Sequence, residues 1–214
     1  MTLIRSNPLF RLKRAELIAD ICGLPHSDAE RIQAVVIERD KIFDRYNEIS
    51  GRKAPAKYMY RIILEKIKGE AVTAATVDYL FEESNSLFAK HPPLLLHADI
   101  PAILAELRSE GISLNIGSNT GFAEGPVMRE TLKAMGIGQY FSFFVFSDEI
   151  GASKPSAAFF EHISCMAGIS KAEIMHVGDN PKADYEGARR NGFRALLIAA
   201  NYTMSDLQKS LLYA

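Results

Sequence analysis

The sequence predicts an α/β protein with a doubly wound parallel sheet and an inserted all-helical domain. Apolar residues recur at helical intervals from residue 7 to about residue 91, and this stretch contains no convincing strand pattern. From His97 onward, short apolar runs alternate with helical patterns. Strands separated by single helices are typical of parallel βαβ units, so the second part of the chain predicts the sheet.

Four helices are expected in the first part of the chain. Asn7 followed by a proline favours a helix start. Ser27 and Glu30 have the spacing of a capping box ahead of a second helix, and a stretch rich in Gly, Pro and basic residues ends that helix. The expected helices are 8–22, 27 to about 49, 58–67 and 76–90.

The second part predicts four strands and their connecting helices. In doubly wound sheets, ligands bind outside the carboxyl ends of the strands, so the residues directly after each strand are the first candidates for function. The expected strands are 112–116, 141–146, 174–177 and 194–199, and the expected helices are 100–110, 125–135, 155–167 and 183–191.

The composition is that of an ordinary globular protein. The chain has 214 residues, of which 48% are hydrophobic and 24% charged, and this excludes an intrinsically disordered chain. Its 25 basic and 26 acidic residues give a net charge of −1, which provides no electrostatic reason to bind nucleic acid or an anionic membrane. No apolar run approaches the roughly 18 residues of a membrane span, and the N-terminus lacks the apolar core of a secretion signal.

The two cysteines, Cys22 and Cys165, lie far apart and form no CxxC pair. We therefore expect neither a disulfide framework nor a zinc site, and a cytoplasmic location. Cys165 lies in an expected helix, where we expect it to be buried and inert.

Polar side chains follow three of the expected strands. Ser118 and Asn119 end the first, where a hydroxyl and backbone N–H groups can hold a phosphate oxygen. Lys154 follows the second, just before a proline, so its charge would point toward the strand ends. Asp179 and Asp184 follow the third, and such a carboxylate pair can share Mg²⁺. Each feature alone also fits a simpler structural interpretation: a capped turn, a solvated lysine, or acidic helix capping.

A hydroxyl, a lysine and an acidic pair at successive strand ends form a recognisable set. The Ser-Asn pair, the Lys154-Pro155 pair and the Gly178-Asp179 pair followed by Asp184 match three motifs in order. With the phrases SDEIGASKPSAAFF and MHVGDNPKADYEGARRNGF, residues 94–200 resemble the haloacid dehalogenase-like (HAD) hydrolase superfamily. The resemblance implies that 1–7 and 94–214 form an α/β core with a Rossmann-like sheet.

The same resemblance gives residues 8–93 a place as an inserted helical cap. Such a cap closes over the site, excludes water and helps to choose the substrate. Its loop at 51–57 is basic and could reach an anionic substrate, but a solvated loop is the simpler expectation.

The family's first motif, Asp-x-Asp-x-Thr, is incomplete here. Thr2-Leu3-Ile4 resembles its tail, and the first aspartate of the chain, Asp20, lies inside an expected helix. We expect the nucleophile, the general acid and a central strand to lie upstream of Met1, or else the chain to be a non-catalytic relative. Without that strand, its neighbours at 112–116 and 174–177 would either keep unpaired backbone groups or pair directly.

The resemblance implies a Mg²⁺-dependent phosphatase that acts on a small phosphorylated metabolite through an aspartyl-phosphate. Ser118, Asn119 and Lys154 would bind the phosphoryl oxygens, and Thr2 would brace the turn after the nucleophile. The chain as given is expected to be catalytically inactive. The alternatives are a non-catalytic HAD-like binding module and a haloacid dehalogenase, which uses the same nucleophile without a metal.

The resemblance gives the residues after the third strand their roles. Asp179 would hold Mg²⁺, and Asp184 would either share the ion or orient Lys154. His176 precedes them on the strand, where a packed histidine outside the site is the simpler expectation.

Overall fold

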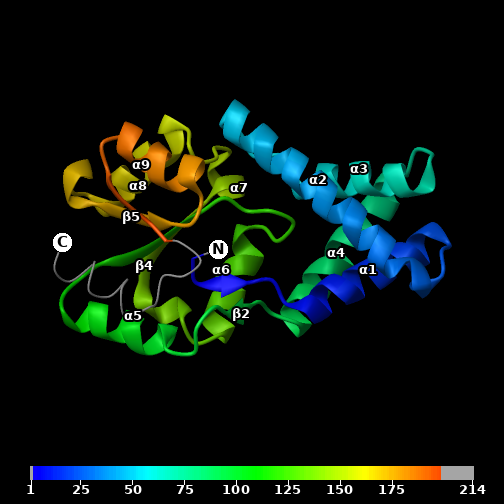
Figure 1. Ribbon diagram of the computed structural model, residues 1–214, viewed down its shortest axis with the longest axis horizontal. Helices are drawn as coiled ribbons and strands as arrows, with labels where there is room; N and C mark the ends of the chain where they lie inside the picture. The colour runs from blue at the N-terminus through cyan, green and yellow to red at the C-terminus, as the bar shows by residue number, and fades with distance from the viewer. Residues whose placement is uncertain (1, 199–214) are drawn as a thin grey trace.

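The computed structural model describes residues 2–198, and its first half is helical. These helices lie together at one end of the molecule (Figure 1). They are α1 (Pro8–Cys22), the short η1 (His26–Asp28), α2 (Ala29–Ser50), α3 (Ala56–Lys68) and α4 (Ala74–Lys90). We call residues 8–90 the helical segment and residues 94–198 the α/β segment.

Most of the helical segment follows the signals in its sequence, but the capping box expected from Ser27 and Glu30 is wrong, because α2 begins after Asp28 without a side-chain cap. The Asn7 side chain caps α1 by accepting a hydrogen bond from the Leu9 N–H at 2.9 Å. Gly23 and Gly51 have positive φ, and this left-handed conformation ends α1 and α2. Helices α3 and α4 begin earlier than expected, because Pro55 and Thr73 are their N-caps.

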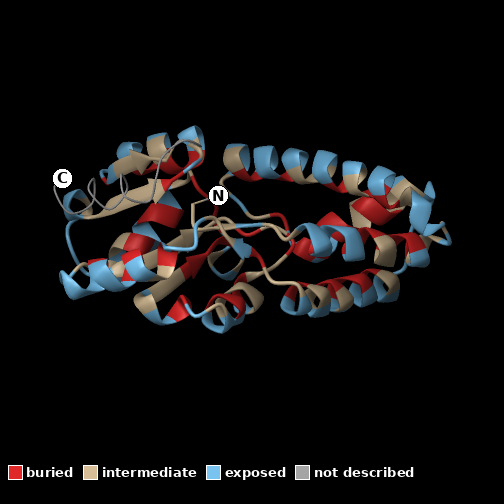
Figure 2. Ribbon diagram, turned by 60° about the horizontal axis from the view of Figure 1, so that its bottom comes forward, coloured by how far each residue is buried: buried red, intermediate tan, exposed pale blue. Residues whose placement is uncertain are grey.

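The helices of this segment share one apolar core. Its fully buried side chains come from all four helices, and Figure 2 shows the buried residues facing inward and the exposed ones outward. Each buried Ile or Leu contributes about 1.5–3 kcal/mol relative to an exposed one, so this core holds the segment together. The largest fully buried aliphatic residues are Ile18, Ile32, Met59, Ile63, Leu64 and Leu80.

No described helix combines the length and the apolar character needed to cross a membrane.

The α/β segment alternates helices and strands as expected. The elements in order are α5 (Ile100–Ser109), β3 (Leu114–Ser118), α6 (Gly125–Ala134), η2 (Gly138–Tyr140), β4 (Phe141–Phe146), α7 (Ser147–Ile150), α8 (Ala157–Ala167), η3 (Lys171–Glu173), β5 (Met175–Gly178), η4 (Pro181–Glu186), α9 (Gly187–Arg190) and β6 (Arg194–Leu197).

The strands pair in parallel, as the alternation predicts. Strand β3 pairs with β4, with Ser118 opposite Phe146, and β5 pairs with β6, with His176 opposite Ala195. Helix α5 packs on one face of both pairs, and α8 and α9 pack on the other face. Helices on both faces of parallel strands define a doubly wound α/β fold, so the predicted fold class is confirmed.

The sheet is interrupted between β3 and β5. Within residues 2–198 these two strands do not pair with each other, and each has a strand partner on one side only. Of the two arrangements expected for these neighbouring strands, direct pairing does not occur in the described part of the chain. One carbonyl of β3, that of Gly117, instead accepts a hydrogen bond from Lys154 Nζ at 2.8 Å.

A short antiparallel ribbon links the two segments. Strands β1 (Ile4–Arg5) and β2 (Leu94–Leu95) pair where the chain enters and leaves the helical segment. The Leu96 N–H donates to the Leu3 carbonyl at 2.9 Å, which extends the pairing by one bond. The two connections therefore run side by side, and we call this ribbon the neck.

Some predicted boundaries are wrong. The strand expected at 112–116 begins at Leu114, because the Ile112 N–H still donates to Leu107 at the end of α5. The helix expected at 183–191 begins at Pro181 as a π-helical turn that α9 continues. The strand expected at 194–199 is described to Leu197, and Ala199 lies outside the described residues.

Cys165 is exposed, contrary to expectation. Helix α8 turns Phe159, Phe160 and Ile163 into the core, and Cys165 lies on the opposite side of the helix.

Candidate active site

The structure brings the ends of β3, β4 and β5 together around Lys154. This residue is in the loop after α7, and only 9% of its side chain is exposed. Its Nζ donates to the Gly117 carbonyl of β3 and forms an ion pair with Asp184 Oδ1 at 2.7 Å. The lysine predicted from one strand end therefore contacts residues from two others.

Asn119 holds the backbone of Lys154 in place. Its amide nitrogen Nδ2 donates to the Lys154 carbonyl at 3.0 Å, and its Oδ1 accepts from the Lys154 N–H at 2.8 Å. The side chain thus forms the same pair of bonds that a neighbouring strand would form. Because the side chain is used in this way, Asn119 can offer a ligand its backbone N–H rather than its amide.

Asp184 and His176 surround the lysine. Asp184 Oδ1 also lies 3.1 Å from His176 Nε2, and Oδ2 accepts from the Asn180 N–H at 3.0 Å. Both oxygens therefore have protein partners, which favours the interpretation of Asp184 as the group that orients Lys154 over the interpretation as a metal ligand.

The electrostatics of this trio follow from burial and proximity. Burial opposes ionisation of Asp184, but the contacts with His176 and Lys154 outweigh it and hold its pKa well below the ordinary value. Burial and the Lys154 charge lower the pKa of His176, against the opposing effect of Asp184. At neutral pH, Asp184 is therefore ionised and His176 is neutral.

The loop after β5 requires its glycine. A Cβ at Gly178 would overlap the Asp184 side chain, so no other residue lets Asp184 reach under the strand end. Asn180 then caps the π-helical turn, because its Oδ1 accepts from the N–H groups of Lys182 and Ala183. The turn between Asp179 and Asp184 therefore serves to bring the Asp184 carboxylate back under the end of β5.

Asp179 lies exposed directly after β5, in contact with Thr2. The Thr2 hydroxyl donates to Asp179 Oδ1 at 3.4 Å. No group of three or more His, Cys, Asp or Glu side chains within residues 2–198 has the spacing of a metal site. A single carboxylate fits Mg²⁺, which binds through one or two carboxylates and completes its shell with water and phosphate oxygens.

Ser118 ends β3 and is half-buried, with its hydroxyl donating to the Asn119 carbonyl at 3.2 Å. Thr120, two residues further on, is held by a network of buried hydrogen bonds. The Thr120 N–H and hydroxyl bond to Ser147 Oγ at 2.9 and 3.1 Å, and the Thr120 hydroxyl donates to Asp148 at 2.7 Å. This network ties the end of β3 to the end of β4.

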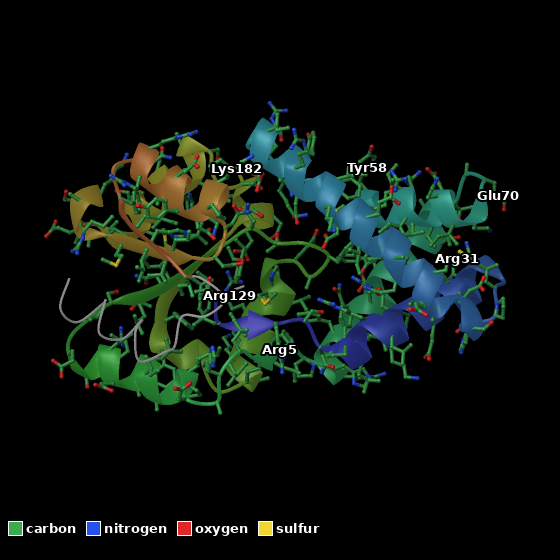
Figure 3. The ribbon with its side chains drawn as sticks, in the orientation of Figure 1. Arg5, Arg31, Tyr58, Glu70, Arg129 and Lys182 are labelled. Carbon is green, nitrogen blue, oxygen red and sulfur yellow. The ribbon has the colours of Figure 1, made fainter. Side chains whose placement is uncertain are left out.

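The helical segment contacts these loops directly. Asn180 Nδ2 donates to Glu48 Oε1 of α2 at 3.0 Å, and the Ser153 N–H donates to the Gly51 carbonyl at 2.8 Å. In Figure 3, Lys182 of the β5 loop is labelled close to the end of α2. The site is therefore covered on one side by the C-terminal end of α2.

The basic loop is only partly solvated. Arg52 and Lys57 are exposed, but Lys53 is half-buried, and its Nζ contacts the Ala54 carbonyl and Met59 Sδ. Burial lowers the pKa of Lys53, and the carboxylates of Glu124 and Asp148 are the strongest charges that oppose this effect. The expectation of a solvated loop therefore holds for Arg52 and Lys57 but not for Lys53.

His176 is the residue that sequence reasoning placed outside the site. The structure puts it against the Lys154–Asp184 pair, with Phe160 packed on its ring. Its position two residues before Gly178, on a strand that leads to the site, was the only sequence signal for His176. That signal could not show that the histidine lies beside Lys154, because this contact depends on the fold.

Comparison with known proteins establishes the class. A family model for haloacid dehalogenase-like hydrolases matches residues 2–192. The chain belongs to the haloacid dehalogenase-like hydrolase family.

Curated relatives include several phosphatases. The chain is 32% identical over 129 residues to a phosphoserine phosphatase from Thermus thermophilus, which covers 60% of this chain and 51% of the relative. It is 26% identical over 140 residues to a phosphoglycolate phosphatase from Pectobacterium atrosepticum, covering 64% of this chain and 58% of the relative. The chain spans about half the length of several curated relatives that it matches.

Solved structures share the fold. A HAD phosphatase from Thermococcus onnurineus has a TM-score of 0.64 at 22% identity, covering 98% of this chain and 93% of that one. An L-2-haloacid dehalogenase from Xanthobacter autotrophicus has a TM-score of 0.62 at 18% identity, covering 100% of this chain and 79% of that one. At these identities the likeness concerns the fold alone.

Proposed function

We propose that this chain carries the phosphate-binding half of a Mg²⁺-dependent phosphatase for a small phosphorylated metabolite. The observation that carries the proposal is the buried lysine at the meeting point of three strand ends, with Ser118 and Asp179 at two of those ends. The relatives named as phosphoserine and phosphoglycolate phosphatases act on substrates of this class.

Each residue has a role that its contacts support. Lys154 supplies a positive charge, and Ser118 with the Asn119 N–H supplies hydrogen bonds, to the oxygens of a phosphoryl group. Asp184 orients the Lys154 side chain through their 2.7 Å contact, and we assign it this positioning role rather than metal binding. Asp179 would be the ligand for Mg²⁺, which when bound would neutralise phosphoryl charge.

The helical segment acts as the cap in this proposal. The proposed cap, residues 8–93, lies between the two strands of the neck in the sequence, and the contacts of Glu48 and Gly51 with the site loops support this role. A cover of this kind excludes water from the phosphoryl group and strengthens its interaction with Lys154.

The same proposal makes the given chain catalytically silent. Asp20, its first aspartate, lies exposed in α1 and pairs with His26 at 2.8 Å, so it cannot act at the strand ends. This observation also favours a second candidate, a non-catalytic module that binds a phosphorylated ligand. A haloacid dehalogenase is a weaker alternative, because Asp179 provides a carboxylate that a metal-free reaction does not need.

Calorimetric titration of the chain with inorganic phosphate, with and without Mg²⁺, tests the proposal. We expect binding that Mg²⁺ strengthens, that Ser118→Ala weakens about tenfold, and that loses its Mg²⁺ dependence in Asp179→Asn. The exposed Asp78→Asn on α4 is the matched control and should bind like the wild type. Equal phosphate affinity in all four proteins would overturn the site. Turnover of p-nitrophenyl phosphate would overturn the claim that the chain is silent.

A further inference from the structure

A cavity of about 200 Å³ lies where the helical segment meets the α/β segment. Its lining comes from α1, α2 and α4 on one side, and from the neck and the loop at 121–123 on the other. Figure 3 shows Arg5, one of its lining residues, at this junction. None of the roles assigned so far uses this cavity.

The cavity contains a buried arginine without a polar partner. Arg14 of α1 is 6% exposed, and its guanidinium lies between two rings, 5.0 Å from the centre of Phe10 and 4.7 Å from that of Phe122. Its Nε is buried and has no hydrogen-bond partner among the described residues, and the charge of Asp40, which lines the same cavity, acts on it without a direct contact. Buried charges are ordinarily paired, because an unpaired one costs several kcal/mol.

A second polar group in the cavity is unpartnered. Oε1 of Gln33, on the facing helix α2, is buried without a hydrogen bond. An amide can present either its oxygen or its NH₂ to a ligand. The rest of the wall is mainly apolar, as the lining residues Val36, Phe88 and Met128 illustrate.

The charge of the cavity is positive. Arg5, Arg11 and Arg14 line it against one carboxylate, Asp40. Burial raises the pKa of Asp40, although Arg14 and the other nearby cations oppose this effect. An arginine fork in a cavity with an excess of positive charge matches a carboxylate, which it can bind through two parallel hydrogen bonds.

The cavity begins next to the proposed phosphate site. Gly121 lies three residues after Ser118, and Ile4 lies two residues after Thr2, so at most about 10 Å of extended chain separates the two places. The rim of the cavity and the proposed phosphate site are therefore neighbours along both connecting segments of the chain.

We propose that Arg14 binds the carboxylate of the leaving group, so that the substrates are phosphate esters of short hydroxy acids. This inference rests on the proposed function, because the phosphate end is placed at Lys154 and Ser118. Phe10 and Phe122 hold the guanidinium flat, and Gln33 offers its amide to the same carboxylate.

A pair of matched esters tests the proposal by calorimetric titration. The two esters differ only at the end away from the phosphate, where ethyl phosphate has a methyl group and 2-phosphoglycolate has a carboxylate. We expect the wild type to bind 2-phosphoglycolate at least tenfold more tightly, since a charge-assisted bidentate pair contributes about that much. In Arg14→Met, which keeps the packing between the rings, the two affinities should become equal while ethyl phosphate binds as before.

Two further variants keep the test sharp. Gln33→Glu adds a negative charge without changing the shape of the side chain, and should reduce the preference for 2-phosphoglycolate even if Arg14→Met folds poorly. The control is Arg31→Met on α2, far from the junction in Figure 3, which should keep the preference unchanged.

The outcomes separate this inference from the proposed function. Equal binding of the two esters by the wild type, or a preference that survives in both Arg14→Met and Gln33→Glu, overturns the role of Arg14 and leaves the phosphate site standing. If the wild type binds neither ester, the proposed function is overturned, and glycolate then decides the inference. Glycolate binding that requires Arg14 supports the carboxylate site, and its absence overturns that site too.

Discussion

Two buried cations in this protein have opposite surroundings. Lys154 donates to the Gly117 carbonyl, forms an ion pair with Asp184 and lies 3.5 Å from His176 Nε2. Arg14 is equally buried and lies against two aromatic rings, with the charge of Asp40 nearby but no hydrogen bond or ion pair among the described residues. The fold pairs the first charge by direct contacts and leaves the second without a direct polar contact.

The contrast separates two ways in which a buried charge can serve a site. A charge that the fold pairs is held in one position, and its removal leaves the partner unpaired. A charge that the fold leaves unpaired weakens the folded state and gains its partner only when a ligand arrives. Loss of the first should therefore damage stability, and loss of the second should damage binding.

The largest expected effect comes from breaking the paired charge. Lys154→Met leaves Asp184 buried and uncompensated, which should lower the free energy of unfolding by about 3–5 kcal/mol. Urea denaturation followed by circular dichroism measures this loss. The control is Lys133→Met on α6, whose ion pair with Glu130 is exposed and should contribute less than about 1 kcal/mol. Equal losses in the two variants would contradict the idea that Lys154 is paired by the fold.

Loss of a hydrogen bond between buried neutral groups should lower the free energy of unfolding by less than loss of the Lys154 charge. Ser147→Ala removes the acceptor of the buried Thr120 N–H, and an unmade buried hydrogen bond costs about 1–3 kcal/mol. The same denaturation experiment should show this loss. The control is the exposed Ser142→Ala on the preceding strand β4, which should change the free energy of unfolding by less than about 0.5 kcal/mol. A neutral result for Ser147→Ala would show that the end of β3 is not fixed by this network.

The histidine beside the pair should make stability depend on pH. Because the pKa of His176 is lowered in the folded protein, the unfolded chain binds the extra proton first, and stability falls as pH drops below about 6.5. Asp184 contributes in the same direction only below the ordinary Asp range, whereas Asp44, whose pKa partial burial and nearby carboxylates raise to about 6, contributes in the opposite direction.

The difference between wild type and His176→Asn isolates the histidine. Melting temperatures measured from pH 7 to pH 5 should fall more for the wild type than for the variant. The exposed His162→Asn should follow the wild type. If the two histidine variants behave alike, His176 does not titrate against Lys154 and Asp184.

Much of the scaffold of the site could be predicted from local signals. The start of α1 at Pro8, the glycine that ends α2 and the parallel strands all follow from turn residues and periodicity, which act within a few positions. The three strand ends that meet at Lys154 were predicted for the same reason, because parallel strands bring their carboxyl ends to one edge.

The remaining features depend on distant parts of the chain. Asp184 was open between two roles, and its contacts with Lys154 and His176 exist only because β5 and the β4 loop lie side by side. Nothing in the sequence indicated that Arg14 is buried, because an arginine in an amphipathic helix is ordinarily solvated. Its burial requires Phe122, which arrives from a loop more than a hundred residues later.

The smallest expected effect on stability is that of Arg14→Met, and it is the prediction that most sharpens the comparison. The variant loses the attraction between the guanidinium and the rings, about 0.5–2 kcal/mol, but it also removes a buried charge that has no partner. These effects oppose each other, so the free energy of unfolding should change by less than about 1 kcal/mol, well below the loss in Lys154→Met. Urea denaturation without ligand measures it, beside the exposed Arg31→Met. A loss of 3 kcal/mol or more would mean that the fold relies on Arg14 as it relies on Lys154, and the two cations would then serve the protein in the same way.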